Sequence, residues 1–568
     1  MKSLKNYMHI FQGVSIPWVI LIAYLLVSLS TSTLFVASTT LTADIIDAAQ
    51  YAINASMLIK FIGVLVGTSV ATVAEWYLRN LAYERINKGV RVRLWTKLIH
   101  LPIRYYDKEN GDSLVSRVTT DASQSYICFY VLIQLINTIY MAVISVVQMV
   151  RYSVQLTIPM ILLLPVSLVV TALCGKLNYT VGEKTQATFA GTLAYLVERT
   201  RNLRLIKAAR MERQEDEAGS QKFNAQYRAG YYKVAASGCW VIAANVISIA
   251  SLFITFFLGG RLVSQGVVTV GRLTGFYTLS SQLDIRLNSL TTLYSNLKNA
   301  NGRVEKISEI LDTPDEKKDG IRFDVADADL VADNISFAYG ERSALEHVSF
   351  RVPRGQVTAI VGSNGAGKST MFKLFERMYD PDEGRLLFGE DDARTFAVDS
   401  WRRSFAIVDQ SSPLLSGTVR ENILYGVKRR VTEEELVEVA KLANVYDFVM
   451  ATPGGFDAPV GMGGVNFSGG QRQCIAIARA MMRNPDYLLL DEATASLDAK
   501  SEQLVSQALT NLMAGRTTVM IAHSYPATRD ATHIVVMKDG HVEAEGSPEE
   551  LLETNEYYRS FAGRAGRA

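Results

Sequence analysis

Long apolar runs fill the first half of the chain, whereas short apolar segments separated by charged residues fill the second half. A helix that spans a bilayer needs about 20 mostly apolar residues. Six segments satisfy this requirement, at approximately 15–38, 55–78, 126–150, 154–174, 236–260 and 270–296. The sixth is the weakest because Asp284 and Arg286 lie inside it. The pattern after about residue 300 is typical of a soluble domain, so we expect an α-helical transmembrane bundle followed by an α/β domain.

Basic residues are concentrated in two of the segments between the predicted spans. Many basic residues lie within 79–104 and 199–213. The segments 39–54 and 260–270 together contain one basic residue, Arg261. By the positive-inside rule, the two basic segments and both chain ends are predicted to be cytoplasmic. The whole chain of 568 residues has a formal net charge of only +2, which gives no reason to expect a nucleic-acid partner.

Apolar residues recur at helical spacing within the basic segments, which predicts that the spans continue as helices beyond the membrane. In the first basic segment these residues are Val92, Leu94, Leu98 and Leu101. We expect each resulting hairpin to carry a short helix at its tip, near 105–112 and near 207–215. Such tips would dock on the soluble domain; the alternative is that they are solvated connectors.

The clearest local pattern of the second half is a glycine-rich loop between an apolar segment, 356–361, and a predicted helix. The loop consists of Gly362, Ser363, Asn364, Gly365, Ala366, Gly367, Lys368, Ser369 and Thr370, and it matches G-x-x-x-x-G-K-[ST]. Glycines allow backbone N–H groups to point at a phosphate, and the N-terminus of the following helix attracts negative charge. Lys368 is positioned to reach the β- and γ-phosphates, and the Ser369 hydroxyl to ligate Mg²⁺. The loop therefore predicts a nucleotide-binding domain.

A second apolar segment, Tyr487–Leu490, ends in Asp491 and Glu492. A buried strand with this ending delivers two carboxylates to one edge of a sheet. Asp491 suits the Mg²⁺ shell, and Glu492 suits a general base that polarises the attacking water. Alone, the pattern would also fit a strand end with solvated acids; together with the glycine-rich loop it indicates a nucleotide hydrolase.

A third pattern, Ser468-Gly469-Gly470-Gln471, stands just before a predicted helix and between the other two patterns. In this order and combination, the three patterns resemble the ATP-binding cassette of ABC transporters, and we refer to Ser468–Gln471 as the signature. The resemblance implies binding of ATP and Mg²⁺ by an α/β P-loop domain.

Four further residues match positions of that family, and their roles are implied by the resemblance. Tyr339 would stack on adenine, and Gln410 would contact Mg²⁺ and the attacking water. Asp498, which follows Ser-Leu, would lie at the interface between two cassettes, and His523 would contact the γ-phosphate. The catalytic residues implied are therefore Glu492, His523 and Gln410.

The resemblance extends to the membrane half. Residues 94–121 are similar to the first intracellular hairpin of ABC exporters, and Ile206-Lys207 with Glu212 is similar to the second. The implied organisation is a six-helix transmembrane domain at 1–300, a linker at 301–328 and a cassette at 329–568. The family binds ATP between the loop of one cassette and the signature of another, which implies a dimer with a second copy or a sister chain. The dimer would work by alternating access.

Three positions depart from the family pattern. Gly461-Met462-Gly463-Gly464 stands where an acidic residue is common, so the effect of Met462 stays open. Phe467 replaces a leucine, and Ser524 follows His523 where arginine is usual. Because Glu492 and His523 are retained, we expect a half-transporter competent in hydrolysis.

The cargo is not specified by these motifs. We expect export of a hydrophobic or amphipathic compound, such as a drug, lipid or peptide, by an integral protein of a bacterial plasma membrane with cytoplasmic termini. The alternatives are uptake of a metal–siderophore complex by an exporter-fold importer, one half of a heterodimeric pump, and an ATP-gated channel.

Polar residues inside the last two spans are candidates for the transport pathway. Asp284 and Arg286 would form a polar stripe in span six, because charged residues in a span are costly unless they face a cavity or partner. The alternative is that this part of span six is cytoplasmic or contacts water, so that its charges have no role in transport. Asn245 and Ser248 in span five fit an amphipathic cargo, but they also fit ordinary helix packing.

Overall fold

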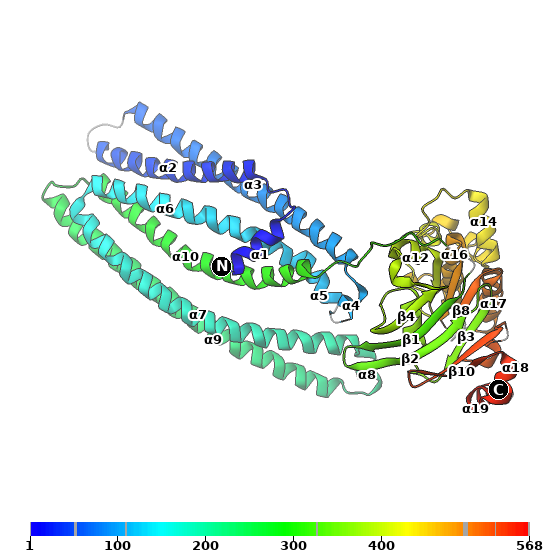
Figure 1. The fold of residues 1–568 in the computed structure, drawn as a ribbon. Coiled ribbons are helices and arrows are strands. Elements are labelled where there is room, and N and C mark those ends of the chain that lie inside the picture. Colours follow the sequence, from blue (N-terminus) through cyan, green and yellow to red (C-terminus); the bar gives the residue numbers. More distant parts are fainter. Residues whose placement is uncertain are drawn as a thin grey trace. The chain divides into compact units, whose positions relative to one another are not determined.

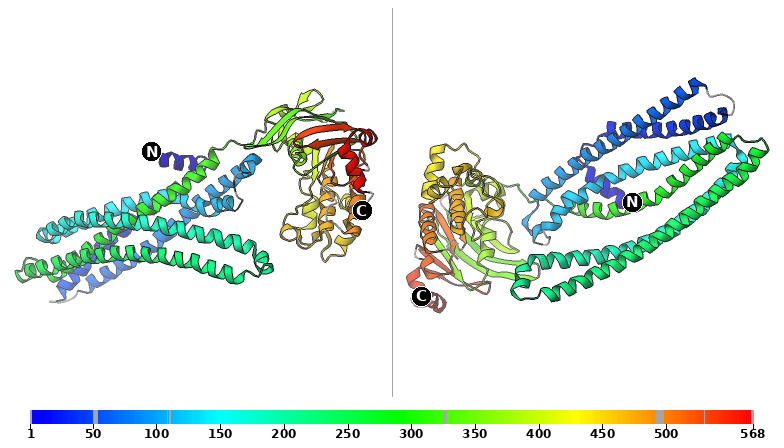
Figure 2. Two further views of the ribbon diagram at one scale, coloured as in Figure 1. Left: turned by 90° about the horizontal axis from the view of Figure 1, so that it is seen from below. Right: turned by 180° about the vertical axis from the view of Figure 1, so that it is seen from behind.

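Long helices form the first half of the chain, and mixed strands and helices form the second half, in a computed structural model (Figures 1 and 2). The structure describes residues 2–49, 54–107, 109, 111–324, 328–491, 498–528 and 530–565. The chain divides into two compact units. The helical unit comprises Met1–Leu101 and Glu109–Pro314, and the α/β unit comprises Pro102–Lys108 and Asp315–Ala568.

The helical unit is built from six long helices and several short ones. Its helices are α1 (Lys2–Phe11), α2 (Trp18–Ala48), α3 (Ala55–His100), α5 (Gly111–Ser116), α6 (Ile127–Tyr152), α7 (Val154–Arg201), α8 (Leu203–Ala208), α9 (Glu212–Ser264) and α10 (Val270–Asp312), with a π-helical turn at Arg117–Asp121 and a 3₁₀ turn at Ala122–Tyr126. Helices α3, α7 and α9 have 46, 48 and 53 residues. Because about 20 residues cross a bilayer, these helices extend well beyond it, which confirms the predicted hairpins.

Five segments of the described chain are helical, long and apolar enough to cross a membrane. They are Trp18–Ala48, Ala55–His100, Ser113–Tyr152, Val154–Arg201 and Glu212–Ser264, in agreement with the first five predicted spans. The sixth predicted span lies in α10, which is helical throughout but is not in this group. Helix α10 packs against α2, α6 and α9, and it buries Leu273, Phe276 and Leu279. Part of its apolar surface is therefore buried against other helices.

Helix α10 continues to Asp312, through the first part of the segment expected to be a linker. Its last turns bury Val304, Ile307 and Leu311 at helical spacing, and the end of the helix packs against α1. The polar contact between His9 Nδ1 and Ser308 Oγ, at 3.3 Å, joins the same two helices. The charged residues of 301–312 therefore belong to the exposed face of a packed helix.

Two sheets organise the α/β unit. The antiparallel sheet has the order β2 (Arg342–Val352), β1 (Leu330–Tyr339), β4 (Glu383–Phe388), β5 (Asp391–Asp392). The second sheet has the order β10 (His541–Gly546), β9 (His533–Lys538), β3 (Val357–Gly362), β8 (Thr517–Ile521), β7 (Tyr487–Asp491), β6 (Phe405–Val408). From β9 to β6 its strands are parallel, and β10 is antiparallel to β9. The fold class thus agrees with the predicted P-loop domain.

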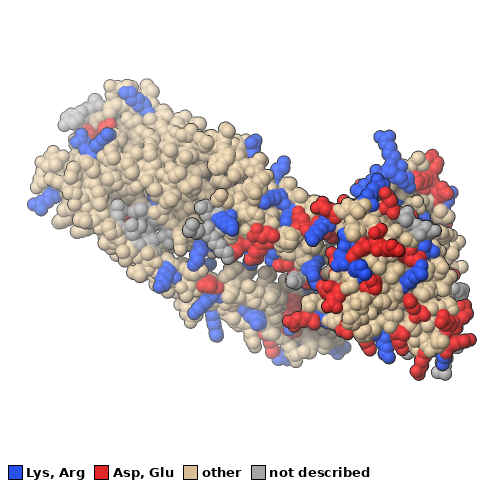
Figure 3. All heavy atoms as spheres, viewed as in Figure 1, with Lys and Arg blue, Asp and Glu red and all other residues tan. Residues whose placement is uncertain are grey.

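Helices and a mainly aliphatic and aromatic core surround these sheets. The helices are α11 (Lys368–Phe375), α12 (Val398–Ser404), α13 (Val419–Ile423), α14 (Glu433–Leu442), α15 (Tyr446–Met450), α16 (Gly469–Arg483), α17 (Ala499–Met513), α18 (Pro548–Thr554) and α19 (Glu556–Ala565). Strand β3 is buried along most of its length, as expected for a central parallel strand. Charged side chains are dense on the visible surface of this unit and sparse over much of the helical unit (Figure 3).

The chain enters the α/β unit through two anchors that follow α10. Glu316 forms a two-pronged ion pair with Arg402, with Nη2–Oε1 and Nη1–Oε2 distances of 2.6 and 3.0 Å. Phe323 is buried, and its ring centroid lies 4.8 Å from that of Trp401 and 4.9 Å from that of Phe388. This part of the expected linker is therefore fixed to the cassette fold.

The tip of the first hairpin belongs to the α/β unit. It contains the short helix α4 (Ile103–Tyr106), close to the predicted position. The Tyr379 hydroxyl donates a hydrogen bond to the Asp107 carboxylate, and Arg104 lies 3.4 Å from Asp382. Burial and the neighbouring carboxylate raise the pKa of Tyr379, so its hydroxyl stays a donor at neutral pH. The second tip forms α8, slightly earlier than predicted, and its docking stays a prediction.

Candidate nucleotide-binding site

The carboxyl ends of parallel strands create the setting for the site. Strands β3, β8 and β7 are neighbours, and they end at Gly362, Ile521 and Asp491. Because the strands run in the same direction, the segments that follow them emerge at one edge of the sheet, where open α/β sheets bind ligands. The segment after β3 is the glycine-rich loop, which leads directly into α11.

The glycines of this loop are required by close packing. A Cβ at Gly362 would lie 2.2 Å from the carbonyl oxygen of Met537. Gly367 has a φ of +99°, and a Cβ there would lie 2.5 Å from Leu345 Cδ2. The loop can therefore keep this path, with its backbone turned into the start of α11, only with glycine at both positions.

Lys368 brings a positive charge into the loop. Only 5% of the residue is exposed, and its Nζ donates to the carbonyl oxygens of Gly362 at 2.8 Å and Ser363 at 2.9 Å. A buried ammonium group is costly without such acceptors, so the loop backbone holds it in place. Lys368 is the first residue of α11, so its positive charge lies at the N-terminus of that helix. Both features attract the negative charge of a phosphate chain.

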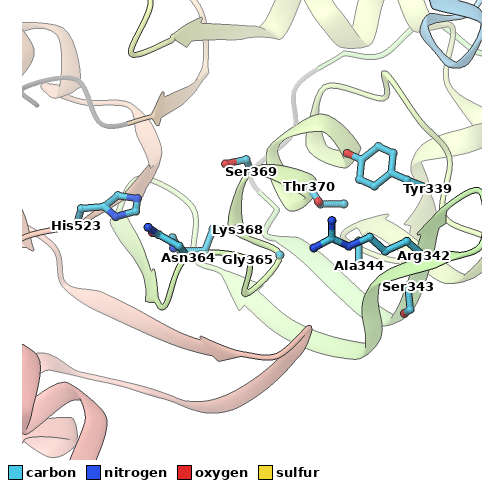
Figure 4. A pocket seen from close by; sticks show the side chains of 11 residues that line it. Tyr339, Arg342, Ser343, Ala344, Asn364, Gly365, Lys368, Ser369, Thr370 and His523 are labelled. Carbon is cyan, nitrogen blue, oxygen red and sulfur yellow. The ribbon is translucent and has the colours of Figure 1, made fainter. Parts of the chain in front are cut away.

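A cavity of about 540 Å³ opens over the loop (Figure 4). It is lined by Tyr339, Arg342, Ser343, Ala344, Asn364, Gly365, Gly367, Lys368, Ser369, Thr370 and His523. Eight of these were candidates from the sequence. The cavity has an aromatic ring at one end and the loop and a histidine at the other. An aromatic ring can stack on a base, and a loop with glycines at 362, 365 and 367 leaves room for phosphates, so the cavity fits a nucleoside triphosphate.

Arg342, Ser343 and Ala344 were not identified from the sequence. They reach the cavity because β1 and β2 form a hairpin in which Tyr339 pairs with Arg342. Gly340 and Glu341 form the turn of that hairpin. A glycine in a short turn after an apolar strand predicts a hairpin, so this sequence signal could have placed Arg342 beside Tyr339. Figure 4 shows the Arg342 side chain between the Tyr339 ring and the loop.

Aromatic and basic neighbours hold the Tyr339 ring in position. Its centroid lies 4.9 Å from that of Phe337 and 5.6 Å from that of Tyr379, in edge-on arrangements. The Lys373 ammonium lies 5.1 Å from the ring centroid. These contacts leave Tyr339 at the cavity wall, where a planar base can stack on it.

Several predicted site residues lie outside the cavity wall. Gln410 is exposed beyond the end of β6, and Asp491 ends β7 in register with Ile521 of β8, two residues before His523. Asp491 is therefore on the strand adjacent to the one that delivers His523. Glu492 lies outside the described residues, so its role as general base stays a prediction.

The signature forms the N-terminus of α16, and its first two residues are exposed. The Ser468 Oγ accepts from the N–H of Gln471 at 3.3 Å, and the Gln471 Oε1 accepts from the N–H of Ser468 at 2.9 Å. This reciprocal cap starts the helix. Ser468 and Gly469 are exposed, and none of the four signature residues lines the cavity. The first turn of α16 thus does not border the nucleotide cavity of its own chain.

Gly470 connects the signature to the next candidate, Asp498. A Cβ at Gly470 would lie 2.6 Å from Ser501 Cβ, so α16 and α17 meet closely at this point. Asp498 caps α17 by accepting from the N–H of Ser501 at 3.2 Å. Hydrogen bonds from the Ser501 side chain and N–H lower the pKa of Asp498. Asp498 is exposed and, like the signature, does not line the cavity.

Two departures from the family pattern have structural counterparts. Met462–Gly464 forms one 3₁₀ turn, with Gly463 at a φ of +67°. Phe467 is buried and packs against Phe448, with centroids 6.1 Å apart, so the aromatic ring is accommodated beneath the signature.

Comparison with known proteins agrees with these features. Residues 345–495 match the family described as ABC transporter, and residues 11–284 match the ABC transporter transmembrane region. The chain is 31% identical over 523 residues to a multidrug resistance ABC transporter ATP-binding and permease protein of Lactococcus lactis subsp. cremoris, covering 91% of this chain and 88% of the relative. It is also 31% identical over 484 residues to an ATP-dependent lipid A-core flippase of Syntrophus aciditrophicus, covering 84% and 80%.

A solved structure extends the likeness to three dimensions. A bacterial Atm1-family ABC exporter with ATP bound superposes with a TM-score of 0.78 at 25% identity, covering 96% of this chain and 98% of that one. Both the membrane region and the cassette are thus shared along nearly the full length. The chain belongs to the ABC transporters, as a half-transporter of the exporter type in which a helical membrane region is fused to one ATP-binding domain.

Proposed function

We propose that this integral membrane protein hydrolyses ATP as a dimer and uses the energy to export a hydrophobic or amphipathic compound by alternating access. The observation that carries the proposal is the separation of two complementary features within one chain. The cavity offers a loop, a lysine and an aromatic ring. The exposed signature offers helix N-terminal donors that the cavity of the same chain does not use.

The residues of the cavity take the following roles. Tyr339 stacks on adenine, the loop 362–367 and the N-terminus of α11 bind the phosphates, and Lys368 neutralises their charge. His523 contacts the terminal phosphate from the end of β8. Glu492 acts as the general base for the attacking water.

The Ser369 hydroxyl, Asp491 and Gln410 are the candidates to hold Mg²⁺. Hydroxyl, carboxylate and amide oxygens are the ligands this hard cation prefers. When bound, Mg²⁺ neutralises charge that develops on the phosphates.

A second chain supplies the missing side of the site. Its signature, Ser468–Gln471, would cover the phosphates with helix N-terminal donors, and its Asp498 would lie at the interface between the two cassettes. Binding of ATP then draws two cassettes together, and hydrolysis with release of phosphate lets them part. Either a second copy or a sister chain satisfies this requirement.

The docked hairpin tip passes this movement to the membrane region. Segment 102–108 is fixed to the cassette fold through Asp107 and Tyr379, while the helices on either side of it belong to the membrane region. The two basic hairpins and both termini are assigned to the cytoplasm, and a bacterial plasma membrane is the proposed location. Export is favoured because the relatives include a multidrug transporter and a lipid flippase.

The first test is the ATPase activity of the chain purified alone in lipid, beside Glu492→Gln. Robust hydrolysis that the substitution abolishes supports a working homodimer. Negligible hydrolysis by a folded, ATP-binding chain overturns the homodimer and points to a sister subunit. Transport direction in oriented vesicles separates export from the second candidate, uptake of a metal–siderophore complex.

A further inference from the structure

A small cavity lies among three helices of the membrane region. Helices α7, α9 and α10 contact one another, and the cavity of about 180 Å³ is lined by residues of all three. The lining polar residues are Ser167 of α7, Asn245 and Ser248 of α9, and Ser281 and Asp284 of α10. The volume is several times the roughly 30 Å³ that one water occupies in the liquid, so the cavity admits a polar head group with a few heavy atoms.

Helical spacing explains which polar residues of α10 reach this cavity. Ser281 and Asp284 are three residues apart and therefore lie on one face of the helix. Arg286, two residues beyond Asp284, is about 200° away around the helix axis and does not line the cavity. The two charges of the sixth predicted span are thus separated, and the cavity contains the carboxylate without the guanidinium.

Within the described part of the chain, Asp284 is a carboxylate without a counterion. It forms no hydrogen bond or ion pair with any part of the chain that the structure describes. A charged group at membrane depth is costly unless it is paired or faces a cavity that admits a partner. Among the described residues no side chain provides such a partner, whereas the cavity leaves room for one.

The neighbouring groups favour a cation that carries N–H donors. Asn245 donates its Nδ2 to the Val241 carbonyl of its own helix at 2.8 Å, and its Oδ1 accepts no hydrogen bond from the described residues. With the hydroxyl of Ser248, the cavity offers several acceptor oxygens around one negative charge. An ammonium group satisfies both the charge and the acceptors, whereas a carboxylate or phosphate would be repelled by Asp284.

We propose that this cavity binds the ammonium group of the transported compound, so that the cargo is an amphipathic organic cation whose apolar part lies outside the cavity. The proposal rests on the proposed transport function and adds the charge and head group of the cargo. Asp284 provides the ion pair, and Asn245 and Ser248 provide acceptors that distinguish an N–H donor from a quaternary cation.

The test uses dansylcadaverine, which has an apolar fluorescent ring and a primary ammonium group, and its N-acetylated form, which has lost the charge. Binding of both probes to the full chain in lipid nanodiscs is measured by fluorescence anisotropy. The variants are Asp284→Asn, which removes the charge at constant shape, Asp284→Glu, which restores it, and Arg286→Gln, which changes a charge on the same helix outside the cavity. Binding of a fluorescent ATP analogue reports that each variant is folded.

The proposal predicts that wild-type protein prefers the ammonium probe to its acetylated form. Asp284→Asn should weaken binding of the ammonium probe by about tenfold or more, the value of one charge-assisted interaction, while Asp284→Glu and Arg286→Gln retain it. Equal binding of both probes to wild type, or unchanged binding of the ammonium probe by Asp284→Asn, would overturn the proposal. Because ATP hydrolysis is measured separately, failure here does not affect the assignment as an ATP-driven transporter.

Discussion

The contact between Gly470 and Ser501 gives a sharp prediction, because it joins the signature helix α16 to the helix that Asp498 caps. A methyl group at Gly470 would lie 2.6 Å from Ser501 Cβ and 2.9 Å from its Oγ. Carbon atoms in contact prefer about 3.5–4.0 Å, so Gly470→Ala creates an overlap of about 1 Å. Overlaps of this kind cost about 1–3 kcal/mol, and the better helix propensity of alanine recovers only about 1 kcal/mol.

The helices must therefore separate, and the exposed end of α16 moves with them. A displacement of about 1 Å in a group that binds a transition state can lower the rate about 100-fold. We expect Gly470→Ala to reduce ATP hydrolysis at least tenfold in nanodiscs, with binding of a fluorescent ATP analogue maintained, because the cavity residues are untouched.

A second substitution tests whether the overlap is the cause. Ser501→Gly removes the atoms that the new methyl group meets, although it also removes the hydroxyl that hydrogen-bonds Asp498. The double variant should therefore hydrolyse ATP almost as fast as Ser501→Gly alone, which is a positive coupling in a double-mutant cycle. Full activity of Gly470→Ala, or failure of Ser501→Gly to restore it, would refute the reasoning.

Three further predictions concern single side chains of the α/β unit. Lys368→Met should weaken binding of an ATP analogue about 100-fold, measured by fluorescence titration, because it removes a charged donor from the loop; unchanged affinity would contradict this. Burial raises the pKa of Glu376 to about 7 from an ordinary value of 4.5, so its contribution to stability is present at low pH and lost as the pH rises through 7. Glu376→Gln should therefore stabilise the unit by on the order of 2 kcal/mol at pH 8 and by much less at pH 5, and an equal shift of the thermal midpoint at both pH values would count against it. Tyr379→Phe removes the hydrogen bond to Asp107 and should lower cargo-stimulated hydrolysis about fivefold while ATP binding persists; unaltered stimulation would argue that this contact does not transmit movement.

Features encoded by neighbouring residues could be predicted from the sequence. The loop 362–370, the start of α11 and the cap at Ser468 depend on spacing within a few residues, and the structure places them accordingly. The long helices α3, α7 and α9 were predicted for the same reason, because their apolar periodicity continues beyond the bilayer.

Features that depend on contacts between distant elements could not be predicted in this way. Arg342 joins the cavity through a strand pairing, and the tip at Asp107 joins the cassette fold through Tyr379. The end of α10 was assigned to a linker because its charged residues concealed the buried positions Val304 and Ile307. In each case the deciding interaction is formed by a partner far away in the sequence.

Asp284 could be identified from the sequence, but its surroundings could not. Its cost at membrane depth marked it as a candidate from sequence alone, together with Arg286. Helical spacing places the two side chains on different faces of α10, and the packing of α7, α9 and α10 decides which face borders the cavity that contains Asn245 and Ser248.

Mixing two inactive variants tests the central claim most directly, which is that each ATP site is formed by the loop of one chain and the signature of another. Lys368→Met disables the loop, and Ser468→Arg blocks the exposed signature; neither variant should hydrolyse ATP alone. In a dimer of one chain of each kind, one site combines an intact loop with an intact signature. The account predicts that co-expression restores ATP hydrolysis in purified mixed dimers. Mixed dimers as inactive as the two parents would contradict it and would place the complete site within one chain.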